Sequence, residues 1–275
     1  MQTNDTGWEN GYKKHFDEIV DKYDKMRTDY PAELFDAVLA YCGPTHRGRA
    51  VEIGAGTGKA TLPFLRAGFA VTAVELGENM CAFLKQRFGT CPGFAVVNGA
   101  FEEAELPEGQ FDLAYAASAF HWVKAEVGCP KLYHLLKPGG VAALFRYNML
   151  PTAEDASYQQ LQQVYEQCYY THYQHATRPV RPTREALQTA PEIRKRFGFD
   201  RLEDYGFTDV EMRFYERQHS YTAEEYIALL DTLSDHRALP EENRQALYEG
   251  IRRVIGQNGG TYHVDYLYQL YMGRK

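Results

Sequence analysis

The chain has 275 residues, of which 44% are apolar, and it carries a formal net charge of −7. This length and composition suit one elaborated domain with a sizeable core, whereas the negative charge disfavours a surface that neutralises nucleic-acid phosphates. The five cysteines form no C-x-x-C pair, and the sequence shows neither a secretory leader pattern nor an apolar run of about 18 residues. We therefore expect a cytoplasmic protein that binds no nucleic acid, no membrane and no metal.

The N-terminal part of the chain predicts two amphipathic helices. Apolar side chains recur at helical spacing from Tyr12 to Met26. Pro31 then occupies the first turn of a second helix, whose apolar face includes Leu34 and Val38. These helices, at about residues 10–42, precede the first predicted strand.

A glycine-rich turn follows that first strand. Residues 50–61 read A-V-E-I-G-A-G-T-G-K-A-T, in which a β-prone run gives way to Gly54, Gly56 and Gly58 and then to helix-compatible residues. Such a strand–turn–helix lets the backbone approach a ligand where a Cβ would clash, and it directs helix N-terminal N–H groups at that ligand. The pattern therefore predicts a ligand-binding turn.

A second short strand ends in Glu75, about twenty residues after the glycines, where a carboxylate can hold the two hydroxyls of a ribose. A nucleoside-containing ligand is therefore predicted. The G-x-G-x-G spacing does not match the G-x-G-x-x-G of dinucleotide-binding proteins. It does not match a P-loop either, because only three residues separate Gly54 from Gly58.

Further predicted strands at 94–97, 111–117 and 140–145 alternate with helical stretches such as 78–88. This alternation is typical of a parallel α/β sheet with helices on both faces. In such a sheet the ligand lies at the carboxyl ends of the strands, where the strand order reverses beside the first strand.

Residues 148–204 interrupt the α/β pattern with a tyrosine-rich helical stripe and a segment rich in arginine and proline. We interpret this insertion as a substrate cap, with helix packing alone as the alternative. Its local excess of positive charge over 178–201 either attracts an anionic substrate or forms a solvated face. Two more alternating segments, 210–215 and 261–272, predict late strands, and Thr222 with Glu225 predicts a capping box between them.

The motif V-E-I-G-A-G-T-G together with Glu75 resembles the first motif and the ribose-binding acid of class I S-adenosylmethionine (SAM) dependent methyltransferases. F-H-W at 120–122 is most similar to the trans-aconitate methyltransferase branch of that class. The resemblance covers most of residues 10–147 and, more loosely, the chain from about 205. It implies a Rossmann-like seven-stranded α/β sheet, with five parallel strands and antiparallel strands at the C-terminal end. It also implies SAM as the cofactor, and a cap formed by residues 10–42 and 148–204.

The resemblance also implies a cofactor-binding set, which consists of Tyr23, Arg27, Glu52, Gly54, Ala55, Gly56, Gly58, Glu75, Leu76, Met80, Ala100, Phe101, Ala116 and Ala117. The family usually places an aspartate on the adenine amino group after the third strand, and this sequence lacks it. We therefore expect backbone groups of Ala100 and Phe101 to read the adenine edge, with Leu76 and the Phe101 ring on its faces. For Tyr23 and Arg27, packing on a surface helix is an equal alternative.

Methyl transfer from SAM is an in-line displacement that depends on proximity and orientation. His121, Trp122 and Arg146 follow the fourth and fifth strands and are the residues expected to face the methyl group. His121 either acts as a general base or shapes its loop. Arg146 either pairs with a substrate carboxylate or forms a structural salt bridge.

The sequence therefore predicts SAM-dependent methylation of a small molecule, and a carboxylic acid is one candidate acceptor. The alternative is a SAM-binding or regulatory module without turnover. The oligomeric state stays open.

Overall fold

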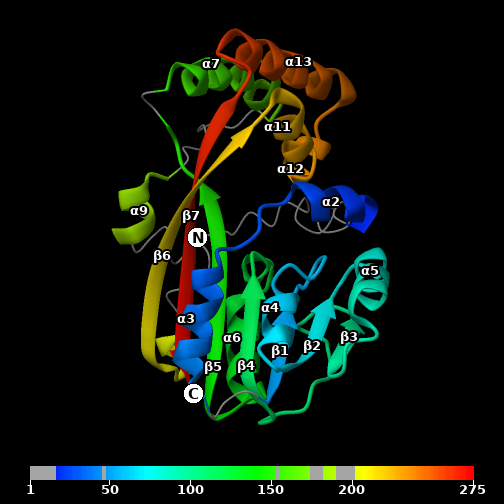
Figure 1. Cartoon of the computed structure of the whole chain (residues 1–275), viewed down its shortest axis with the longest axis vertical. Coiled ribbons are helices and arrows are strands. Elements are labelled where there is room, and N and C mark those ends of the chain that lie inside the picture. Colours follow the sequence, from blue (N-terminus) through cyan, green and yellow to red (C-terminus); the bar gives the residue numbers. More distant parts are fainter. Residues whose placement is uncertain (1–16, 45–47, 153–154, 174–181, 190–201) are drawn as a thin grey trace. The chain divides into compact units, whose positions relative to one another are not determined.

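The computed structural model describes residues 17–44, 48–152, 155–173, 182–189 and 202–275 (Figure 1). The chain divides into two compact units, which we describe separately. The helical unit takes its described residues from 1–28, 149–183 and 216–266, and the sheet unit takes them from 29–148, 184–215 and 267–275. The residues that were expected to form one cap, 10–42 and 148–204, are therefore divided between the two units.

Seven strands of the described residues form one sheet in the order β3-β2-β1-β4-β5-β7-β6. The strands are β1 (Arg49–Ile53), β2 (Ala70–Glu75), β3 (Phe94–Asn98), β4 (Phe111–Ala117), β5 (Leu136–Met149), β6 (Thr208–Tyr221) and β7 (Tyr262–Arg274). The first five are parallel, and β1 and β4 are buried along nearly their whole length, as expected for central strands covered on both faces. The predicted seven-stranded α/β sheet is confirmed.

The late strands run antiparallel, and they are longer than the sequence predicted. Gly139 and Gly140 exchange backbone hydrogen bonds of 2.9 Å with Lys275, whereas Leu150 bonds to Asp265, so that β5 and β7 pair in opposite directions. β5 begins at Leu136, where it pairs with Phe111 of β4, and not at the predicted Gly140. Its β7 partner lies at the far end of the chain, so local sequence carries no signal for that pairing.

The helices of the sheet unit cover a continuous apolar core. They are α3 (Ala32–Cys42), α4 (Thr61–Arg66), α5 (Glu78–Phe88), α6 (Ala125–Leu135) and α9 (Arg184–Thr189), together with the short helices η2 (Phe120–Trp122) and η5 (Glu203–Tyr205). Pro31 caps α3, which buries Leu34 and Val38 as its spacing predicted. α5 has the predicted bounds.

The helical unit contains the described part of the predicted N-terminal helix and most of the described insertion. Its helices are η1 (Asp17–Ile19), α2 (Val20–Met26), α7 (Ala156–Tyr165), the π-helix η3 (Glu166–Tyr170), α8 (Thr171–Tyr173), α11 (Ala223–Leu230), α12 (Ser234–Arg237) and α13 (Glu241–Gln257). The capping box of Thr222 and Glu225 is confirmed. Tyr12, Phe16 and most of the arginine-rich segment lie outside the described residues.

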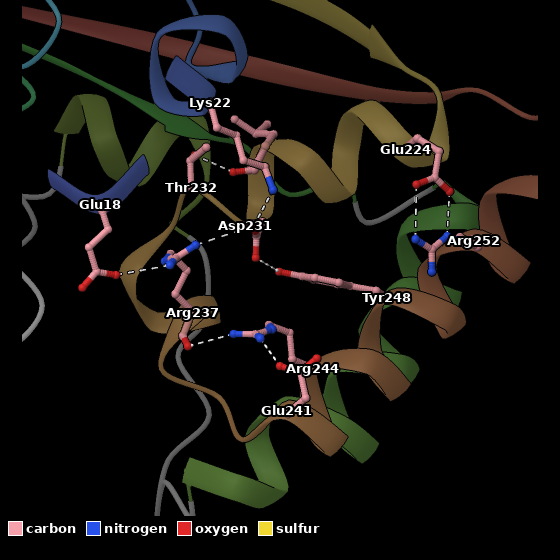
Figure 2. Close-up of polar contacts among 11 residues, drawn as sticks. Glu18, Lys22, Glu224, Asp231, Thr232, Arg237, Glu241, Arg244, Tyr248 and Arg252 are labelled. Carbon is pink, nitrogen blue, oxygen red and sulfur yellow. Dashed lines mark hydrogen bonds and ion pairs between the residues drawn. The ribbon is translucent and has the colours of Figure 1, made fainter. Parts of the chain in front are cut away.

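Asp231 is the centre of a polar network in the helical unit (Figure 2). Its carboxylate accepts a hydrogen bond from Lys22 of α2 and another, of 3.1 Å, from the Tyr248 hydroxyl of α13. Arg237 lies 3.8 Å away and also reaches Glu18. The network therefore joins η1 and α2 to α12 and α13. In none of the described helices is there an apolar stretch long enough to cross a membrane.

Candidate functional site

The glycine turn after β1 requires glycine for both conformation and space. Gly54, Gly56 and Gly58 have φ angles of 64°, 56° and 82°, a region that residues with a Cβ rarely adopt. A Cβ on Gly54 would lie 2.5 Å from the Cβ of Ala119, and one on Gly58 would lie 2.3 Å from the Phe88 ring. The turn therefore brings bare backbone to the carboxyl end of β1, beside the point where the strand order reverses.

Glu75, at the carboxyl end of β2, is bound to this turn. Its Oε2 accepts a 2.7 Å hydrogen bond from the Gly56 N–H, and its Oε1 accepts a 2.9 Å bond from the Gly77 N–H. Each carboxylate oxygen has a second lone pair for a further donor. The two backbone bonds thus fix the orientation of the carboxylate at the carboxyl end of β2, beside the glycine turn.

Leu76 follows directly, and its side chain is 47% exposed, which is unusual for a large apolar residue in this unit. The Asn98 side chain donates 3.0 Å hydrogen bonds to the carbonyl oxygens of Glu75 and Leu76, so that β3 supports this corner. An exposed apolar side chain on a fixed backbone suits the face of an adenine ring. Met80, in contrast, is buried in α5.

The loop after β3 differs in part from the prediction. The Phe101 ring is 4% exposed and belongs to the hydrophobic core, and so it is not the exposed ring expected to stack on adenine. Lys131 of α6 lies 5.2 Å from the centre of that ring and donates to the carbonyl oxygens of Glu102 and Ala104. Burial lowers the pKa of Lys131, an effect that Glu102 opposes. The predicted backbone contacts of Ala100 and Phe101 stay a prediction.

Glu52, within β1, is 1% exposed and so has no open carboxylate to offer. Its Oε2 accepts hydrogen bonds from the hydroxyls of Thr61 and Tyr115, while its Oε1 has no hydrogen-bond partner among the described residues. Burial raises the pKa of Glu52 to about 8, although the two hydroxyls act in the opposite direction. The predicted contact between Glu52 and the cofactor stays a prediction.

The carboxyl end of β4 carries the residues expected on the acceptor side. Ala116 is buried and Ala117 is partly exposed, and η2 then presents an exposed His121 beside Trp122, with ring centres 5.1 Å apart. Next to β4, the Arg146 side chain on β5 donates a 2.7 Å hydrogen bond to Asn148. The imidazole and indole therefore follow the end of β4, and the guanidinium comes from β5 at the level where its pairing with β4 ends.

The sequence analysis assigned no role to four residues that make hydrogen bonds around this site: Tyr30, Ser118, Asn98 and Lys131. Tyr30 precedes Pro31 at the start of the second predicted helix, whereas the other three act through contacts between distant segments. Tyr23 and Arg27 belong to the helical unit. There the Arg27 guanidinium lies 5.0 Å from the Tyr23 ring centre and donates to the Thr232 carbonyl at 2.9 Å.

Residues 51–144, which run from β1 into β5 through the glycine turn and Glu75, match the family described as Methyltransferase domain. These residues form a class I SAM-dependent methyltransferase domain. The predicted SAM cofactor and the predicted enzymatic activity are thereby confirmed.

The methyltransferase is similar to curated relatives that are themselves uncharacterized methyltransferases. It is 24% identical to one from Schizosaccharomyces pombe over 85% of this chain and 84% of that protein. It is 32% identical to one from Mycobacterium tuberculosis over 46% of this chain, and the match spans about half of that relative (49%).

Solved structures share the fold at low identity. A protein from Anaeromyxobacter dehalogenans assigned as a type II methyltransferase superposes with a TM-score of 0.60 at 21% identity, covering 90% of this chain and 97% of that one. Phosphoethanolamine N-methyltransferase 2 of Haemonchus contortus, bound to phosphomonomethylethanolamine and S-adenosylhomocysteine, superposes with a TM-score of 0.53 at 16% identity. That superposition covers 94% of this chain and 57% of the Haemonchus contortus chain.

Proposed function

We propose that this methyltransferase transfers the methyl group of SAM to a small-molecule acceptor, and that the acceptor is a carboxylic acid. The observation that carries the proposal is that His121 follows the end of β4, while Arg146 lies within β5 directly after Phe145, the partner of the last β4 residue. A guanidinium whose orientation is set by Asn148 suits bidentate recognition of a planar carboxylate. The similarity of F-H-W at 120–122 to the trans-aconitate methyltransferase branch also supports a carboxylic acid acceptor.

The residues around the glycine turn fit the nucleoside of SAM, because the turn offers backbone without side chains at Gly54, Gly56 and Gly58 and Glu75 faces it with a fixed carboxylate. We propose that Glu75 binds the ribose hydroxyls and that Leu76 lies on one face of the adenine. When bound, SAM supplies an electrophilic methyl group on a sulfonium. The turn and the end of β4 hold the two reactants in line, which is the main source of acceleration for such a displacement.

The acceptor determines what His121 does. A carboxylate is already a nucleophile at neutral pH, and so it needs Arg146 for orientation and no base. A hydroxyl or ammonium acceptor must lose a proton, and the exposed imidazole of His121 is a group that could take it. In the carboxylic acid proposal His121 orients the acceptor and Trp122 shields it.

The N-terminal helix and the tyrosine-rich insertion are proposed to act as a cap that limits water at the methyl group. This proposal rests on the sequence resemblance, which places the leading helices of the family over the cofactor and assigns Tyr23 and Arg27 to it. Hydrogen exchange tests it. Slower exchange in residues 17–28 and 155–173 with saturating S-adenosylhomocysteine is expected, and equal exchange with and without it would contradict a cap.

The acceptor itself is found by mass spectrometry. A small-molecule extract is incubated with the protein and SAM carrying a labelled methyl group, and Glu75→Ala, in which SAM binding is expected to be weakened, serves as the matched control. Labelled methyl esters of carboxylic acids that depend on Glu75 are expected. Label found only on amines, or only on protein or RNA in a parallel incubation, would contradict the carboxylic acid proposal.

A further inference from the structure

Ser118, the residue directly after β4, has a φ angle of 53° and thus adopts the left-handed conformation. Asp209 is the other described residue besides glycine with a positive φ. This conformation is unfavourable for any residue with a Cβ, and it persists where surrounding contacts hold it. Such positions concentrate at functional sites.

Two hydrogen bonds hold Ser118 in place. Its N–H donates to the Phe145 carbonyl at 2.8 Å, and its Oγ accepts from the Tyr30 hydroxyl at 2.7 Å. The Tyr30 ring lies among other aromatic rings, with centre distances of 5.0 Å to Phe145, 5.9 Å to Tyr147 and 6.0 Å to Tyr268. Rings packed at these distances fix the direction of the Tyr30 hydroxyl.

The backbone next to Tyr30 is tied to the sheet unit as well. The Asp29 carbonyl accepts a 3.1 Å hydrogen bond from the Tyr268 hydroxyl, and the Asp29 carboxylate receives Lys59 of the glycine turn at 2.7 Å. Residues 29 and 30 therefore contact the glycine turn, the end of β4 and β7, three segments that are far apart in the sequence.

The turn at Ser118 lies beside the glycine turn. Ala119 comes next and approaches Gly54 so closely that a Cβ on Gly54 would lie 2.5 Å from the Ala119 Cβ. η2 with His121 and Trp122 follows at once. The conformation of Ser118 therefore sets both how closely the end of β4 approaches the glycine turn and where η2 begins.

We propose that Tyr30 is a positioning residue, whose hydroxyl holds Ser118 in the left-handed conformation so that the end of β4 closes against the glycine turn and shapes the SAM site. The proposal rests on the assignment of that turn to SAM and is independent of which acceptor is methylated. Tyr30 acts through Ser118.

The test measures the Kd of S-adenosylhomocysteine by calorimetry for wild type, Tyr30→Phe, Ser118→Gly and the double variant. Tyr30→Phe removes one hydroxyl and leaves the ring, and it is expected to weaken binding about threefold to tenfold, the loss typical of one hydrogen bond. Glycine adopts the left-handed conformation without cost. Ser118→Gly is therefore expected to restore binding in the double variant to within about twofold of Ser118→Gly alone.

Two further variants keep the test decisive. Ser118→Ala removes the acceptor and leaves Tyr30 intact, so it is expected to weaken binding as much as Tyr30→Phe does. It therefore tests the same hydrogen bond if Tyr30→Phe folds poorly. Tyr268→Phe removes a hydroxyl from the same ring cluster that bonds to Asp29, and any loss it causes is expected to persist when Ser118→Gly is added.

Wild-type affinity in Tyr30→Phe or in Ser118→Ala would overturn the proposal. A Tyr30→Phe loss that Ser118→Gly does not restore would also overturn it, because Tyr30 would then act by a contact of its own. Failure of the carboxylic acid proposal leaves this readout unchanged, since the measurement contains no acceptor.

Discussion

The Glu75 carboxylate and the Gly56 N–H are joined by a 2.7 Å hydrogen bond, so the acid at the end of β2 and the glycine turn after β1 form one binding element. The sequence places these residues 19 positions apart, and parallel pairing of β1 with β2 brings them together. The same carboxylate is the proposed ligand of the ribose.

Replacing Glu75 with alanine is expected to weaken SAM binding about tenfold to more than a hundredfold. Losing charge-assisted hydrogen bonds to the ribose costs roughly 1.5–3 kcal/mol, and the glycine turn also loses the acceptor of the Gly56 N–H. Calorimetry with SAM measures the loss, with Glu78→Ala in the nearby α5 as the exposed control. Unchanged affinity in Glu75→Ala would refute the ribose assignment.

Replacing His121 with asparagine separates the two roles of that side chain once an acceptor is known. For a carboxylate acceptor, kcat is expected to stay within about tenfold of wild type, because no proton has to be removed. For a hydroxyl or amine acceptor, kcat is expected to fall about 10²- to 10⁴-fold, because the variant lacks the imidazole that would remove the proton. SAM affinity is measured alongside, and its collapse in the variant would assign His121 to the cofactor pocket instead.

The buried Glu52 predicts a pH dependence of stability. Its pKa is about 8 in the folded protein against an ordinary value of 4.5, and so the folded state holds its proton more tightly than the unfolded state. The stability contributed by protonated Glu52 is fully present below about pH 4.5 and is lost as the pH rises through about 8, by up to about 1.4 kcal/mol per pH unit.

Urea denaturation of wild type and Glu52→Gln between pH 5 and 8 checks this dependence. Glutamine does not titrate, so the free-energy difference between the two proteins is expected to shift in favour of the variant as the pH rises. A constant offset can arise from the new amide, and so the slope is the decisive quantity. Parallel curves would show that Glu52 titrates normally.

In the helical unit, Asp231→Ala is expected to reduce the free energy of unfolding by about 1–2 kcal/mol. The carboxylate is 18% exposed and accepts from Lys22 and Tyr248, although the exposed position of Lys22 weakens its share. Glu224→Ala, which removes an exposed ion pair with Arg252 (Figure 2), is the control and is expected to change little. An equal effect of both substitutions on urea denaturation would contradict the central role of Asp231.

Features that depend on neighbouring residues were predictable from the sequence alone. The turn of Gly54, Gly56 and Gly58 needs positive φ angles that glycine adopts freely, α5 occupies the predicted range 78–88, and the Thr222–Glu225 capping box is closed by residues three positions apart. Strand–helix alternation then predicted the parallel sheet, and the acid at the end of the second strand gave the position at which we propose that the ribose binds.

The tertiary structure alone decided which groups are buried and which distant groups meet. Phe101 has an aromatic side chain that local sequence leaves free to face a ligand, yet the packing of α6 and Lys131 places it in the core. Burial gives Glu52 its raised pKa, and β7 extends β5. The bond between Tyr30 and Ser118 joins residues 88 positions apart. No local pattern encodes such contacts, because each forms only when segments that are remote in the chain are packed against one another.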